Sequence, residues 1–205
     1  MPQHAASNLP QRTVLRAMTV LACATPWLAW SAPQMIQVTT EAGQPVPNAA
    51  VSVLVKGAKT TAAPGTTKEI GQKDKAFTPN LLVIQTGTQV AFPNFDTVRH
   101  HVYSFSPART FEIKLYAGTP AAPVVFDKAG TATLGCNIHD RMLAYVHVVD
   151  TPYFGITDAQ GKVSIDLPDG EHRLRVWTPN LGEKSPGVEQ PLKTGLPLAI
   201  VRAKV

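Results

Sequence analysis

The apolar runs of this chain are short, and turn residues separate them. Eighteen prolines and fourteen glycines are spread over 205 residues, and no stretch keeps the 3.6-residue period of an amphipathic helix. The runs at 124–126, 145–149, 163–167 and 172–177 are rich in β-branched and aromatic residues, which is typical of strands bounded by turns. The sequence therefore predicts an all-β fold.

The N-terminal segment has the composition of a secretory signal peptide. Arg12 and Arg16 precede an apolar run at 17–30, and residues 1–31 contain no acidic side chain. A basic segment followed by a short apolar one is typical of such peptides. Because a bilayer span needs ~20 apolar residues, we expect no membrane span. We expect residues 1–31 to be cleaved and the mature chain to be periplasmic; a lipoprotein anchored through Cys23 is the alternative.

Removal of this segment leaves one cysteine, Cys136, in a mildly basic chain. Without the two arginines of the signal peptide, the 19 basic residues fall to 17 against 14 acidic ones. This small excess, without a run of lysines, does not indicate nucleic-acid binding. A single thiol cannot form an internal disulfide. Cys136 must therefore stay free, pair with another chain or bind a ligand.

Cys136 opens a tight loop between two expected strands, and two further donor side chains follow it. The segment CNIHDRM at 136–142 places His139 and Met142 at C-x2-H-x2-M spacing. A lone buried cysteine is more often an inert apolar residue, but a thiolate, an imidazole and a thioether on one short loop can converge. A second imidazole would complete a trigonal site with a weak axial sulfur, which is typical of blue-copper proteins.

The second imidazole can come from the adjacent pair His100 and His101. The pair follows two apolar runs around the turn at 86–88. Neighbouring residues on a strand point to opposite faces, so we expect only one of the two to reach the metal.

Residues 70–149 resemble the cupredoxins, a family of blue-copper proteins. The likeness lies in FTP at 77–79, in VIQTGTQVAFPNFD at 83–96 and in the C-x2-H-x2-M loop at 136–142, which is most like that of the amicyanin branch. The resemblance implies a Greek-key β-sandwich with one type-1 copper ion.

Carried over by position, the resemblance also implies a set of metal ligands. Cys136 matches the thiolate ligand and His139 the second histidine. Met142 matches the axial thioether, and His100 the first histidine by its spacing from the preceding asparagine. Cupredoxins usually have asparagine directly after that histidine, whereas this chain has His101. His101 either replaces that support or is itself the ligand; the spacing favours His100.

The flanking segments resemble the two halves of a second, smaller β-sandwich of the carboxypeptidase regulatory-like (transthyretin-like) family. The likeness lies in turn residues at 43–46, 157–161 and 168–170. The alternative is one continuous sandwich with extra strands. The expected division is a signal peptide at 1–31, the first part of the regulatory-like sandwich at 33–56, a linker at 57–68, the cupredoxin domain at 69–150 and the second part of the regulatory-like sandwich at 151–205.

The function implied by the resemblance is that of a periplasmic one-electron carrier, not an enzyme, because four protein donors leave no metal position for a substrate. The segments HHVYSF, KLYAG and LGCNIHDRM also resemble exported proteins often labelled methylamine utilisation proteins. The alternatives are a copper- or zinc-binding sequestration or delivery module, and a structural or interaction protein. The redox partner is not specified by the sequence.

A few other side chains carry secondary expectations. By resemblance, Pro93, Ile138 and Leu143 contribute to an apolar patch above the second histidine. His147 is expected to be an ordinary surface or half-buried histidine, and Trp177 a packing residue.

Overall fold

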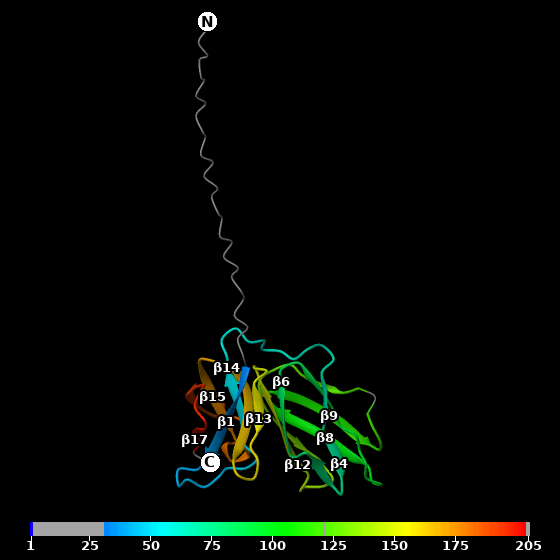
Figure 1. Ribbon diagram of the computed structural model, residues 1–205. Helices are drawn as coiled ribbons and strands as arrows, with labels where there is room; N and C mark the ends of the chain where they lie inside the picture. Colours follow the sequence, from blue (N-terminus) through cyan, green and yellow to red (C-terminus); the bar gives the residue numbers. More distant parts are fainter. Residues whose placement is uncertain (2–30, 121, 204–205) are drawn as a thin grey trace.

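The computed structural model describes Met1, residues 31–120 and residues 122–203 (Figure 1), and the predicted signal peptide lies outside this range except for its two end residues. Within this range the chain has no α-helix, and the all-β prediction is confirmed. The strands are β1 (Ser31–Thr39), β2 (Ala50–Leu54), β3 (Thr67–Glu69), β4 (Gly71–Lys73), β5 (Ala76–Thr78), β6 (Leu81–Gln85), β7 (Thr88–Ala91), β8 (His100–Ser106), β9 (Arg109–Tyr116), β10 (Val124–Phe126), β11 (Gly130–Gly135), β12 (Leu143–Val149), β13 (Phe154–Ile156), β14 (Lys162–Pro168), β15 (Glu171–Trp177), β16 (Val188–Lys193) and β17 (Ala199–Arg202), with one 3-10 helix, η1 (Pro179–Leu181).

The sheets form two groups that lie side by side in Figure 1, each with its own core. Sheets β14-β1-β17 and β13-β2-β15-β16 enclose one core, which contains Ile36, Val51 and Val176. Sheets β6-β12-β11-β8-β9 and β10-β7-β3 enclose the other, which contains Phe92 and Leu134. The chain therefore starts in the first group, builds the second, and returns to the first.

The segment expected as a linker, 57–68, is mostly irregular but ends inside a sheet. Thr67 and Lys68 belong to β3, which pairs in parallel with β7 through Lys68 and Val90. The small polar residues of this segment gave no apolar alternation, so the sequence alone did not reveal this short edge strand. The domain boundaries and the family of the flanking segments stay predictions.

Strand β12 is buried on both faces and joins the two groups. Val146 and Val148 point into the second core. On the opposite face, the ring centroids of Tyr145 and His147 lie 5.5 and 4.9 Å from that of Trp177, which belongs to β15 of the first group. The Trp177 side chain is fully buried, as expected of a packing residue.

The expectation for His147 is wrong, because this side chain is only 5% exposed and stacks on Trp177 with an interplanar angle of 14°. Its Nδ1 lies 2.9 Å from the Thr131 hydroxyl. Burial, together with the positive charge of Arg175, lowers the pKa of His147 to about 4. The imidazole is therefore neutral at neutral pH, which suits a ring packed between two sheets.

A carboxylate adds a polar link between the groups. Glu183, in the segment after η1, accepts hydrogen bonds from the hydroxyls of Ser106 on β8 and Thr133 on β11, at 2.5 and 2.7 Å. The Thr133 N–H in turn donates to the Ser106 hydroxyl oxygen at 2.9 Å. These hydrogen bonds hold the pKa of Glu183 below its ordinary value, although burial opposes the shift.

We expect Glu183→Gln to lower the free energy of unfolding by roughly 1 kcal/mol at pH 7, because a half-exposed carboxylate contributes less than the ~1.5–3 kcal/mol of a buried charged hydrogen bond. A carboxyl whose folded pKa is depressed contributes stability above its ordinary pKa, 4.5, and loses it as the pH falls through the lower folded value. Denaturant unfolding at pH 7 and near pH 3 measures the difference between variant and wild type, which should shrink at the lower pH. Glu171→Gln, at an exposed position of β15, is the control. A loss equal to that of the control would contradict the link.

Candidate metal centre

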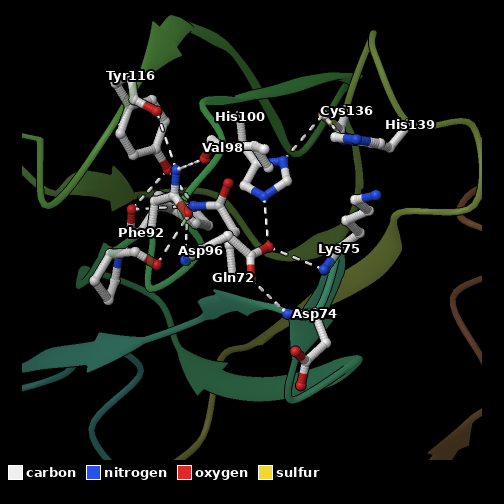
Figure 2. Close-up of polar contacts among 12 residues, drawn as sticks. Gln72, Asp74, Lys75, Phe92, Asp96, Val98, His100, Tyr116, Cys136 and His139 are labelled. Atoms are coloured by element: carbon white, nitrogen blue, oxygen red, sulfur yellow. Dashed lines mark hydrogen bonds and ion pairs between the residues drawn. The ribbon is translucent and has the colours of Figure 1, made fainter.

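Three side chains from two parts of the second sheet group converge at one end of the sheet. The Sγ of Cys136 lies 4.0 Å from Nδ1 of His100 and 3.8 Å from Nδ1 of His139 (Figure 2). The three donor atoms all lie within 4.8 Å of one another. His100 is fully buried and Cys136 nearly so, whereas His139 is partly exposed. The structure thus brings together three of the four residues that the sequence analysis expected to bind the metal.

The hairpin of β11 and β12 presents the loop that carries two of these donors. The ladder between the two strands ends at the pair Gly135 and Leu143, and the N–H of Met142 donates to the His139 carbonyl oxygen at 2.9 Å. A Cβ at Gly135 would lie 2.7 Å from the Tyr103 ring on β8. The absence of a side chain therefore leaves room for this ring against the backbone beside Cys136.

The donor separations fit a metal ion bound by one thiolate and two imidazoles. Metal–nitrogen bonds are about 2.0–2.1 Å long and metal–sulfur bonds about 2.3 Å. A nitrogen–metal–sulfur angle of about 120° then separates the nitrogen from the sulfur by about 3.8 Å. The two observed Sγ–Nδ1 distances, 3.8 and 4.0 Å, are close to this value. Thiolate and imidazole together suit copper and zinc, in contrast to the oxygen ligands that magnesium and calcium prefer.

Met142 lies on the buried side of the same loop. Its side chain is 2% exposed and belongs to the core cluster that also contains Cys136. The loop residues Ile138 and Asp140 are exposed instead. The thioether is therefore held in the interior on the loop that carries Cys136, and its role as a ligand stays a prediction.

His101 points away from the three donors. Its Nε2 lies 3.1 Å from a carboxylate oxygen of Glu112 on β9, and its ring meets the edge of Tyr103 at 5.8 Å. The pairing of β8 with β9 shifts register between His100 and Val102, and such a bulge can redirect a side chain. The two neighbouring imidazoles thus have different partners, Cys136 for His100 and Glu112 for His101.

The structure adds one residue that sequence reasoning missed. Oδ2 of Asp96 lies 2.7 Å from Nε2 of His100, on the side of the ring opposite Nδ1. Burial alone would raise the pKa of Asp96, but hydrogen bonds from Lys75 N–H, the His100 ring and Asp74 N–H outweigh it and hold that pKa below its ordinary value. A carboxylate four residues before a candidate ligand histidine was the only sequence signal for this contact.

The apolar patch expected near His139 differs in composition from the expectation. Ile138 and Leu143 are 47% and 49% exposed, whereas Pro93 is buried and contributes nothing to the surface. The Pro93 carbonyl oxygen accepts a hydrogen bond from the backbone N–H of Gln72, which places β4 beside this residue.

No helix in the described part of the chain has the length and apolar character needed to cross a bilayer.

Comparisons with known proteins leave the family open and return copper proteins as structural neighbours. No family model and no curated protein matches the chain. Amicyanin from Paracoccus versutus aligns with 18% identity and a TM-score of 0.35, over 48% of this chain and 96% of its own. A purple cupredoxin from Nitrosopumilus maritimus aligns with 22% identity and a TM-score of 0.34, over 40% of this chain and 98% of its own. The copper-containing nitrite reductase from Thermus scotoductus aligns with 23% identity and a TM-score of 0.37, over 47% of this chain but 25% of its own.

Proposed function

We propose that this chain is an exported type-1 copper protein that carries single electrons. The observation that carries the proposal is the convergence of one cysteine sulfur and two imidazole nitrogens within 4.8 Å of one another. His100, Cys136 and His139 would hold the metal, and Met142 would supply a weak axial thioether. Copper bound in this way can accept and release one electron.

The surroundings of the donors favour a carrier over a catalyst. Cys136 and His100 are 4% and 0% exposed, so water has little access to either side chain. The donors are held by strands of one five-stranded sheet, which limits their movement when the charge of the site changes. With Met142 in the fourth position, no place remains for a substrate on the metal.

The exposed edge of His139 would be the route for electrons. His139 faces Cys136 and is partly exposed, whereas His100, the other imidazole that faces Cys136 in the described part of the chain, is buried. Ile138 and Leu143 place apolar surface beside it, and we propose that a redox protein docks there.

Addition of Cu(II) to the metal-free protein tests the proposal most simply. One equivalent should produce an intense visible band from thiolate-to-copper charge transfer, and Cys136→Ser should abolish it, because the sulfur is the source of the band. Visible and electron paramagnetic resonance spectra are the measurements. Stoichiometric binding without colour would contradict the type-1 assignment and favour a sequestration or delivery module.

Met142→Gln should leave copper bound and lower the reduction potential. The axial ligand tunes the potential of such sites, and a harder oxygen donor stabilises Cu(II) relative to Cu(I). Copper content and spectroelectrochemical titration are the measurements. A variant that folds but binds no copper would show that Met142 is a primary ligand.

His100→Ala should empty or bleach the site, whereas His101→Ala should retain copper with a shifted spectrum. The reason is that the His100 ring faces Cys136, while the His101 ring faces Glu112. Loss of a supporting contact typically costs ~10–100-fold in metal affinity, which still leaves the site filled at excess copper. The reverse pattern, with colour lost only in His101→Ala, would assign the ligand to His101.

A further inference from the structure

Asp96 is the meeting point of three N–H donors from two different parts of the chain. Its Oδ1 accepts the backbone N–H of Asp74 at 2.7 Å, and its Oδ2 accepts the backbone N–H of Lys75 at 2.9 Å. Oδ2 also faces Nε2 of His100 at 2.7 Å (Figure 2). The carboxylate therefore connects the turn between β4 and β5 to the ring of a candidate metal ligand.

The turn that holds Asp96 has an unusual backbone. Asp74 and Lys75 both have positive φ, 54° and 58°, a conformation that L-residues adopt rarely. They form the two-residue loop between β4 and β5, and the favoured hairpin turn of that length requires positive φ at both positions. This strained turn points two consecutive N–H groups at Asp96.

A second set of hydrogen bonds fixes the segment between Asp96 and His100. The Asn94 side-chain oxygen accepts the Asp96 N–H at 2.9 Å, and its amide nitrogen donates to the carbonyl oxygens of Val98 and Tyr116 at 2.8 and 3.1 Å. Asp96 is thus held from both sides, and its position does not depend on His100 alone.

The identity of the acceptor determines which nitrogen of His100 carries the hydrogen. An ionised carboxylate can only accept hydrogen bonds, so the neutral imidazole must place its hydrogen on Nε2. The other nitrogen, Nδ1, then has a free lone pair, and this is the atom that faces Cys136 Sγ at 4.0 Å.

We propose that Asp96, held by the strained Asp74–Lys75 turn, is the positioning residue that fixes the tautomer and orientation of His100 and presents Nδ1 to the metal. The part of this inference that concerns the metal rests on the proposed function, whereas the part that concerns the tautomer does not.

An amide cannot replace this carboxylate. Three N–H groups converge on Asp96, and they use both of its oxygens. Asparagine has one oxygen and one NH2 group, so in Asp96→Asn at least one of the three N–H groups must face another donor. With the NH2 group in place of Oδ1 only the Asp74 N–H loses its acceptor, and an oxygen still faces His100. Asp96→Ala, which removes both oxygens, is therefore the variant that tests the contact with His100.

The first test uses metal-free protein, and the measurement on wild type alone can decide it. The ¹⁵N chemical shifts of the histidine rings report which nitrogen is protonated. In wild type we expect His100 to be protonated at Nε2 and unprotonated at Nδ1; in Asp96→Ala, where Nε2 has lost its acceptor, the population should shift toward Nδ1–H. A wild-type His100 with its hydrogen on Nδ1 would overturn the inference, whether or not the protein binds copper.

The second test measures binding of Zn(II) and Cu(II) by competition with a chelator. Asp96→Ala should weaken both by ~10–100-fold, the usual effect of removing the partner of a ligand histidine. Asp140→Ala, which removes a carboxylate from an exposed position beside His139, should bind as wild type does. Thermal unfolding of each metal-free variant shows that the compared proteins are folded. Wild-type affinity in folded Asp96→Ala would overturn the positioning role, while a colourless copper complex in wild type would overturn only the proposed electron transfer.

Discussion

Strand β12 carries the central constraint of this structure, because one face packs in the core of its own sheet group and the other in a smaller cluster between the two groups. Val146 and Val148 face the core beneath the candidate metal centre, and Tyr145 and His147 face Trp177 of the other sheet group. Burial of a valine or a larger apolar side chain is worth about 1.5–3 kcal/mol, so both faces fix the strand. A slip of one residue would exchange the two sets of side chains. The position of the loop from Cys136 to Met142 is fixed by this strand, which follows it directly.

The candidate metal centre depends both on residues that are close in the sequence and on one residue that is distant in the sequence. Cys136, His139 and Met142 lie on one loop, so their proximity follows from a single hairpin. His100 comes from 36 residues earlier in the chain and reaches Cys136 only because β8 and β11 lie in the same sheet, paired at Tyr103 and Gly135. The Asp96 carboxylate then constrains the ring from its other side. The strands and the carboxylate together limit how far the donors can move, and this would keep reorganisation small in the proposed electron transfer.

The sequence predicted the parts of the structure that follow from local pattern. Alternating apolar residues located β11 and β12, and the donor spacing located the loop between them. Alternation along β8 also separated His100 from His101. These features depend on residues within one hairpin or one strand, where periodicity is a direct consequence of backbone geometry.

Other features depend on contacts that no local pattern encodes. His147 was expected near the surface. Alternation shows which residues share a face of β12, but it does not show that the first sheet group covers that face. Pro93 was expected in the surface patch by resemblance, yet it is buried, with Gln72 of β4 beside it. The role of Asp96 depends on a turn more than twenty residues upstream, at Asp74 and Lys75. Its two positive φ values cannot be read from the residue types.

X-ray absorption at the copper edge of the loaded protein tests the central claim most directly, because it reports the atoms around the metal without reference to function. Our account predicts one copper ion per chain with one sulfur at about 2.3 Å or less and two imidazole nitrogens at about 2.0–2.1 Å, taking zinc bond lengths as the guide. A copper environment of nitrogen and oxygen alone, with no sulfur at bonding distance, would contradict it.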